Sequence, residues 1–182
     1  AYLGSVRYRW SSGIYASLFA ARASYGGSDA RDSELAATLG YLHRLNTAVA
    51  VAVSASRYTY PGPGQHRHYD WSERRISTFI GDHWQFQSGY TNRWLGRNQN
   101  LPFIEAVFRY PLPLDVTVDA SVGRYNARKA IGMNYGYVEL GLSREILGLA
   151  GRISWTGIEA KTRRRFPRWV DNEWTASLVW NF

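Results

Sequence analysis

The strict alternation of side chains in residues 171–182 constrains the fold more than any other feature of the sequence. Apolar residues occupy every second position counted back from the C-terminus: Phe182, Trp180, Leu178, Ala176 and Trp174. Between them stand mostly polar or small residues. A period of two predicts a β-strand with one apolar and one polar face.

The aromatic residues of this stretch continue to the last position, with no polar tail after Phe182. Such an ending resembles the C-terminal recognition signal of bacterial outer-membrane β-barrels. This resemblance implies that the barrel-assembly machinery recognises Trp174, Leu178, Trp180 and Phe182. We therefore interpret the whole chain, residues 1–182, as a single all-β domain, an antiparallel transmembrane β-barrel that this strand closes.

The composition agrees with a barrel. The sequence contains no run of 18 apolar residues, so we expect no transmembrane helix. Its 8 Trp and 13 Tyr are typical of the aromatic girdles at the two membrane interfaces of a barrel. The absence of Cys excludes disulfides and thiolate metal sites.

Alternating segments recur along the chain and predict about eleven strands, joined by short and long connections in turn, as in outer-membrane barrels. The expected strands are 2–10, 14–25, 34–43, 47–60, 71–80, 84–94, 102–110, 114–125, 135–143, 147–158 and 171–182. In 14–25 we expect Tyr15, Phe19 and Tyr25 to face lipid. In 114–125 the valines at even positions should face lipid, and Asp115 and Asp119 should face the lumen.

Eleven strands of alternating direction would leave the first and last strands parallel, so they cannot close an antiparallel barrel. The two edges would also expose unpaired backbone groups to lipid, at a cost of several kcal/mol for each group. We therefore expect twelve strands in the complete barrel, with the first one upstream of Ala1.

Several short motifs, in order, resemble the Gcw_chp family of bacterial conserved hypothetical proteins. They are SGIYA at 12–16, YTYPG at 58–62, YDWSE at 69–73, Glu105 followed by PLP at 111–113, and VGRY at 122–125. The resemblance covers nearly the whole chain. It implies an outer-membrane barrel in a Gram-negative bacterium, but no biochemical activity.

Charged residues fall on the side of the strands that should face the lumen. They are Arg7, Arg9, Glu34, Glu73, Arg75, Arg93, Glu105, Arg109, Asp115, Asp119, Glu139 and Arg152. We expect a ladder of paired charges, because an unpaired charge away from water is costly. The alternative is a charged constriction or a site for a small polar solute. Glu73, Arg75, Glu105 and Arg109 are predicted to form one network.

The net charge of +8 comes almost wholly from arginine, and its densest run is Lys161, Arg163, Arg164, Arg165 and Arg168. At the outer rim of a barrel these side chains would meet the phosphates of lipopolysaccharide, since the guanidinium fork suits bidentate phosphate contacts. A solvated loop without a fixed partner is the other interpretation. Nucleic acid is not an expected partner, because the arginines are spread over strands and loops rather than one helix.

We predict neither a metal nor a cofactor nor an active site. His66 and His68 lie near Asp70 but lack a third ligand at fixed spacing. His43 and His83 have no adjacent nucleophile.

The predicted function is a porin-like, non-enzymatic channel for small solutes in the bacterial outer membrane, in contact with outer-membrane lipid and lipopolysaccharide. One alternative is a structural barrel with a plugged lumen that binds an envelope protein in a larger assembly. The third hypothesis is an outer-membrane enzyme acting on lipid or peptide.

Overall fold

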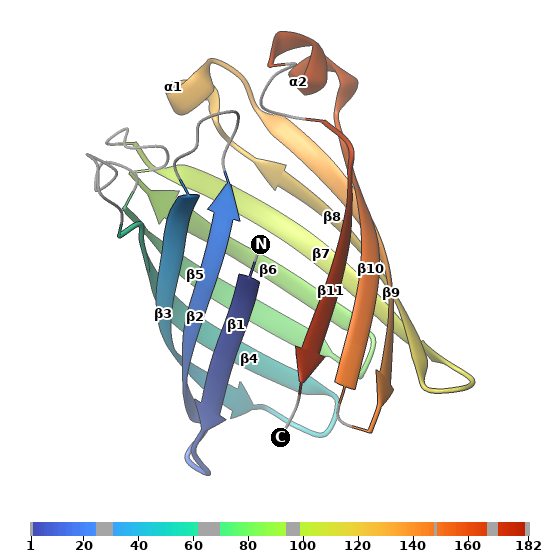
Figure 1. Cartoon of the computed structure of the whole chain (residues 1–182). Coiled ribbons are helices and arrows are strands. Elements are labelled where there is room, and N and C mark those ends of the chain that lie inside the picture. Colours follow the sequence, from blue (N-terminus) through green and yellow to red (C-terminus); the bar gives the residue numbers. More distant parts are fainter. Residues whose placement is uncertain are drawn as a thin grey trace. The chain divides into compact units, whose positions relative to one another are not determined.

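The computed structural model describes residues 2–24, 31–61, 70–93, 99–147, 149–166 and 171–180. In this part of the chain it has eleven β-strands and two short α-helices (Figure 1). In chain order they are β1 (Tyr2–Arg9), β2 (Ile14–Ser24), β3 (Arg31–Arg44), β4 (Val49–Thr59), β5 (Trp71–Ile80), β6 (Trp84–Asn92), β7 (Leu101–Leu112), β8 (Val116–Tyr125), α1 (Arg128–Ile131), β9 (Tyr135–Ile146), β10 (Leu149–Ile158), α2 (Ala160–Arg165) and β11 (Glu173–Trp180).

The strands form one antiparallel sheet in the order of the sequence, β1 to β11. The all-β class and the eleven strands of the sequence prediction are confirmed. Within the described residues β1 pairs with β2 alone and β11 with β10 alone, so the sheet has two edges and is not closed. No helix in the described ranges has the length and apolar character needed to cross a membrane.

The chain divides into two compact units. Unit 1 comprises Ala1–Thr78 and Ser88–Pro102, and unit 2 comprises Phe79–Gln87 and Phe103–Phe182.

In unit 1, the register of the strands separates a polar face from an apolar face. Arg7 lies opposite Ser17, Ser17 opposite Thr38, and Thr38 opposite Ser56, with the last two hydroxyls 2.8 Å apart. This row belongs to the polar face.

The row beside it, Tyr8, Ala16, Leu39 and Ala55, belongs to the apolar face of unit 1. On this face Leu39 remains 62% exposed, and Tyr8 and Leu18 are similarly accessible. These three side chains are therefore turned away from any core that the described residues provide.

The prediction that Tyr15 and Phe19 lie on the apolar face is wrong. Tyr15 pairs with Gly40 and Phe19 with the buried Ala36, both on the polar face. The Arg7 guanidinium also lies 5.9 Å from the centroid of the Tyr15 ring. Residues 14–24 alternate large and small side chains on both faces, so hydrophobicity does not distinguish them. Tyr25, the third residue of that prediction, lies outside the described residues.

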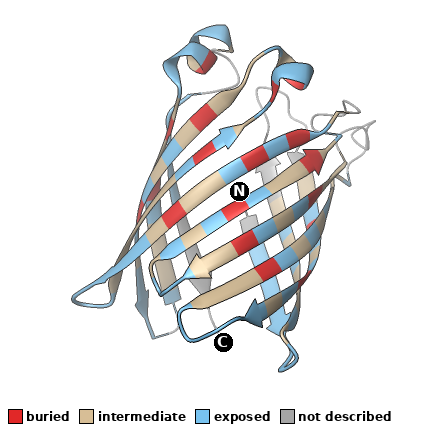
Figure 2. Ribbon diagram, turned by 180° about the vertical axis from the view of Figure 1, so that it is seen from behind, coloured by how far each residue is buried: buried red, intermediate tan, exposed pale blue. Residues whose placement is uncertain are grey.

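Unit 2 has the same two-faced pattern. Val118 lies opposite Tyr110 and Leu142, and Leu142 lies opposite Ile153, which gives a continuous apolar row. Asp119, on the other side of β8, contacts Arg152 of β10 on the polar face. The predicted alternation of Val118 and Asp119 is thus confirmed, and Figure 2 shows buried and exposed residues interleaved along the strands.

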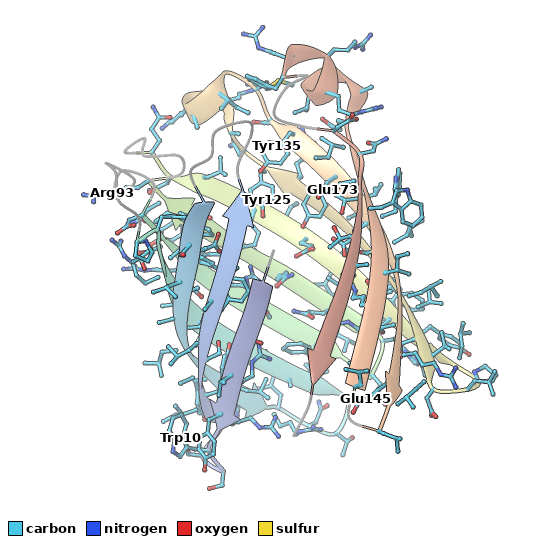
Figure 3. All side chains as sticks on the ribbon, in the orientation of Figure 1. Trp10, Arg93, Tyr125, Tyr135, Glu145 and Glu173 are labelled. Carbon is cyan, nitrogen blue, oxygen red and sulfur yellow. The ribbon has the colours of Figure 1, made fainter. Side chains whose placement is uncertain are left out.

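Aromatic side chains gather on the apolar face of unit 2 near the turn that joins β5 to β6. The Trp84 ring lies 4.7 Å from Phe108 and 5.9 Å from Phe86, and Tyr110 lies 6.3 Å from Phe108. In unit 1, Tyr8 and Trp10 form an edge-to-face pair at 4.8 Å, and Trp10 stands at the turn end of β1 (Figure 3).

Several predicted boundaries move. The turn after β7 is at residues 113–115, because Pro111 and Leu112 still pair with Thr117 and Val116. Asp115 was predicted to point inward from a strand, but it lies in this turn with a φ of 57° and is exposed.

The predicted turn at residues 144–145 is also wrong, because both residues pair with β10 and β9 extends to Ile146. Of the remaining connections, two predicted loops contain the helices α1 and α2. Figure 1 shows both helices at the same end of unit 2, opposite the short turns that join β7 to β8 and β9 to β10. At α1 the buried residues are the N-cap Ala127 and Ala130, and in α2 the buried residue is Thr162.

Candidate functional site on the polar face of the sheet

In unit 1 the most buried charge is Glu73 of β5, which is 6% exposed. Its Oε1 accepts hydrogen bonds from Nε and Nη2 of Arg75 at 3.0 and 2.5 Å. The hydroxyl of Thr91 in β6 donates to Oε2 at 3.5 Å. The predicted pair of Glu73 and Arg75 is therefore present. Both residues belong to β5, and Thr91 of the neighbouring strand β6 also binds the Glu73 carboxylate.

The YTYPG and YDWSE motifs meet where β4 ends and β5 begins. The rings of Tyr58 and Trp71 stack at 3.7 Å with an interplanar angle of 7°. The Trp71 indole donates to the Tyr60 hydroxyl at 3.2 Å, and the Tyr60 amide donates to Asp70 at 3.1 Å. Asp70 also forms an ion pair with Arg57 at 3.2 Å. In this structure the motif residues join two strand ends, which is a structural role.

In unit 2, Glu105 of β7 lies between two neutral donors. The Tyr137 hydroxyl donates to Oε1 at 2.7 Å, and the Gln87 amide donates to Oε2. Arg109, on the same strand, forms no ion pair with Glu105 or with any other described residue. The prediction that Arg109 belongs to one paired network with Glu73, Arg75 and Glu105 is therefore wrong, and Glu105 has tyrosine and glutamine as its partners.

The Tyr137 ring occupies space that a side chain at Gly123 would need. A Cβ on Gly123 would stand 2.3 Å from Cε1 of Tyr137, its partner across β8 and β9. Tyr125 lies 6.1 Å from Tyr137 and stacks on Tyr135 at 4.9 Å. Figure 3 shows Tyr125 and Tyr135 close together near the α1 end of their strands. The glycine of the VGRY motif thus makes room for the tyrosine that binds Glu105.

A second charge cluster lies on β8, β9 and β10. Nη2 of Arg152 is 2.6 Å from Asp119 and 2.5 Å from Glu139, and Nη1 donates to Ser154 at 3.2 Å. A Cβ on Gly141 would come within 2.8 Å of both the Asp119 carboxylate and the Arg152 guanidinium. The cluster holds two carboxylates and one guanidinium, so it carries a net negative charge.

Of the remaining predicted lumen charges, Glu34 lies on the polar face of β3, and Asp115 lies in a turn. Within the described part of the chain, no ion pair involves Arg7, Arg9, Arg93 or Arg109. Arg93 is exposed beyond the end of β6 with a φ of 53° (Figure 3).

Lys161, Arg163, Arg164 and Arg165 of the basic run lie in the helix α2 and not in a loop, which corrects the sequence prediction. Lys161 forms an ion pair with Glu159 at 2.9 Å, and Arg163 lies 3.8 Å from Asp171. Arg164 and Arg165 are exposed and form no ion pair with a described residue. Arg168 lies outside the described residues, as do His66 and His68.

Of the predicted assembly signal, Trp174 is 70% exposed on the apolar face. The backbones of Leu178 and Trp180 belong to β11, and Phe182 lies outside the described residues.

Sequence reasoning missed the neutral partners Gln87, Thr91, Tyr137 and Ser154, because it searched for charges alone. A signal was present for one of them. Gly123 interrupts an otherwise well-formed strand, and a glycine within a strand often marks the close approach of another group.

The arrangement gives carboxylates and guanidinium groups in fixed positions on one face of a sheet. Such groups bind or select polar solutes by charge and hydrogen bonding. Nδ1 of His83 donates a hydrogen bond to the Arg109 carbonyl at 2.9 Å, and Nδ1 of His43 lies 3.4 Å from the Tyr41 hydroxyl. Comparison with models of known families and with curated proteins found no match.

Proposed function

We propose that the chain is an integral outer-membrane β-barrel whose polar face lines a narrow lumen for the passage of small polar solutes. The observation that carries the proposal is the reversal of the usual burial pattern. Large apolar side chains are exposed on all eleven strands, for example Leu39 of β3, Ile104 of β7 and Leu140 of β9. Charged and hydrogen-bonded side chains such as Glu73 are buried on the opposite face. Exposed apolar patches of this extent are rare on proteins surrounded by water and are the rule on lipid-facing strands.

The aromatic clusters support a membrane position. In unit 2, Trp84 and Tyr110 lie on the apolar face close to the short turns, and in unit 1 Trp10 does so. Tryptophan and tyrosine favour the interface between lipid and water, because each has an apolar ring and a polar hydrogen-bonding group. The resemblance to the Gcw_chp family has the same implication.

The closed form of this barrel has twelve strands. The sheet has edges at β1 and β11, which run parallel to each other when neighbouring strands alternate in direction. One strand between them, running the opposite way, satisfies both edges and gives the even number found in bacterial barrels. That strand comes from outside the eleven described here.

Arg164 and Arg165 at the α2 end are the candidates for contact with lipopolysaccharide phosphates, because the other two cations of the helix already have carboxylate partners. This contact requires α2 to lie on the outer side of the membrane, and the short turns on the periplasmic side.

A plugged structural barrel is the second candidate. The side chains that favour it are Tyr137 and Arg152, which extend across neighbouring strands and fill space left by glycines. Side chains packed in this way reduce the room for a water path.

Conductance in planar bilayers separates the two candidates. The chain, refolded together with the strand that completes its sheet, is inserted into bilayers, and single-channel steps are recorded for the wild type and for Arg152→Gln. A channel gives discrete steps, and the loss of the cation next to two carboxylates raises the permeability ratio of potassium to chloride. Membrane insertion without any steps favours the plugged barrel. A protein that stays in the aqueous phase when mixed with vesicles refutes the membrane location.

A further inference from the structure

The apolar face of unit 1 carries an open groove over β3, β4, β5 and β6. Its volume is about 670 Å³, within the range of small-molecule sites. Leu39, Tyr41, Ala55 and Ile76 are among the residues that line it. A second hollow of about 570 Å³ extends toward β1 and shares Leu39 and Ala55 with the first. The two hollows therefore adjoin, and together they offer an elongated apolar channel on the surface.

One charged residue stands where the hollows meet. Arg74 of β5 lines both of them, and its guanidinium lies 5.8 Å from the centroid of the Tyr90 ring. It forms no ion pair with any residue that the structure describes. The neighbouring Arg57 differs, because Asp70 and Ser72 engage its guanidinium at 3.2 Å. The channel therefore has one uncompensated positive charge among apolar walls.

We propose that this channel binds one phosphorylated lipid, with the phosphate on Arg74 and an acyl chain along Leu39, Ile76 and Ala55. The inference rests on the proposed membrane location. A lipid phosphate supplies the anion that Arg74 lacks, and a guanidinium binds phosphate through a planar fork. The acyl chain matches walls that present almost no polar groups.

The backbone beneath the channel disfavours an extended peptide as the occupant. The strands β3 and β4 are paired with each other from Leu35 to Arg44, and β3 also pairs with β2. Their amide and carbonyl groups are thus engaged within the sheet, and a peptide could not add as a further strand here. A lipid needs no backbone partner.

The experiment measures lipid retention by native mass spectrometry. Protein refolded in dodecyl maltoside is incubated with dipalmitoyl phosphatidic acid, with dipalmitoyl glycerol, or with glycerol 3-phosphate. The wild type is expected to retain one phosphatidic acid at least ten times more often than either of the other two. If dipalmitoyl glycerol is retained equally well, the phosphate is not recognised. If glycerol 3-phosphate is retained equally well, the acyl chains are not recognised, and the site does not select a lipid.

Matched variants locate the site. Arg74→Gln removes the charge, and Ala55→Leu places a larger side chain in the lining of both hollows. Each variant is expected to lower retention at least fivefold. Their controls lie on the apolar face of unit 2, where Arg144→Gln removes an exposed arginine and Ala120→Leu adds a large side chain. The inference is overturned if test and control variants retain lipid equally, or if a co-purified protein occupies the site instead.

A second measurement separates this test from the test of the proposed function. It follows insertion of the protein into phosphatidylcholine vesicles by its protection from protease. Protein that inserts but shows no Arg74-dependent retention refutes the lipid site alone. Protein that does not insert refutes the membrane location and the lipid site with it.

Discussion

The close contact between Tyr137 and Gly123 predicts a large effect from a very small substitution. Gly123→Ala adds one methyl group at a site whose backbone conformation alanine adopts readily, so any loss of stability comes from the contact. The new Cβ would stand 2.3 Å from the tyrosine ring, and ordinary contact begins at 3.4 Å. The ring must therefore move by about 1.1 Å, the difference between these two distances.

This movement also breaks a hydrogen bond. The Tyr137 hydroxyl is 2.7 Å from Glu105, so a shift of this size along the bond exceeds hydrogen-bonding distance. Overpacking costs about 1–3 kcal/mol, and a hydrogen bond to a charged group contributes about 1.5–3 kcal/mol. Replacing glycine by alanine also lowers the conformational entropy of the unfolded chain, which stabilises the folded protein by about 0.4–1 kcal/mol. We expect Gly123→Ala to lower the free energy of unfolding by about 2–4 kcal/mol on these principles.

The assay is equilibrium urea unfolding of the protein folded in phospholipid vesicles, followed by tryptophan fluorescence. Gly4→Ala is the control, because a Cβ on Gly4 meets no atom within 4 Å. In a Tyr137→Ala background, Gly123→Ala should cost almost nothing, since the clash and the hydrogen bond are both gone. The reasoning fails if Gly123→Ala is as harmless as Gly4→Ala, or if it costs the same in both backgrounds.

Three further predictions use the same unfolding measurement. Val118→Arg places a charge on the apolar face and should lower the free energy of unfolding in a bilayer by about 2–4 kcal/mol. The neighbouring Thr117→Arg, on the polar face, should lower it by less than half as much, and equal losses would contradict the assignment of the faces. Arg152→Gln leaves two carboxylates without their shared cation and should cost about 2 kcal/mol, whereas Arg144→Gln, which removes an exposed arginine of β9, should cost much less; equal losses would exclude this cause. Asn46→Ala removes a side-chain oxygen that accepts two backbone amides at 2.8 Å and should cost about 1 kcal/mol, whereas Asp82→Ala in the next short turn should be neutral; the reverse order would refute the capping role.

Alternation in the sequence was sufficient for the strands and, in most of them, for their faces. It works for Val118 and Asp119 because one face of that strand has apolar neighbours, such as Leu142, and the other has polar neighbours, such as Arg152. It fails for Tyr15, because a large aromatic ring on the polar face is accommodated by Gly40 on the neighbouring strand. The space that receives such a ring is created by the pairing of two strands, and one strand's pattern does not contain it.

The charge pairs were harder to predict than the faces. Glu73 and Arg75 are two residues apart on one strand, so their contact follows from the period of two. Arg152 reaches Asp119 across an intervening strand, and this depends on the register and on the missing side chain at Gly141. The two helices were missed because each is shorter than the window in which a helical period can be detected.

The pairing of every strand with its neighbour in the sequence has a consequence for how the sheet assembles. Each new pairing closes a loop only as long as one connection, so its entropic cost stays small and nearly constant along the chain. Arg9 and Tyr15, for example, are joined through a single tight turn. A sheet that grows in this manner exposes two edges when it holds two strands and still two when it holds eleven. Hairpins can therefore be added one after another without increasing the number of unpaired edges.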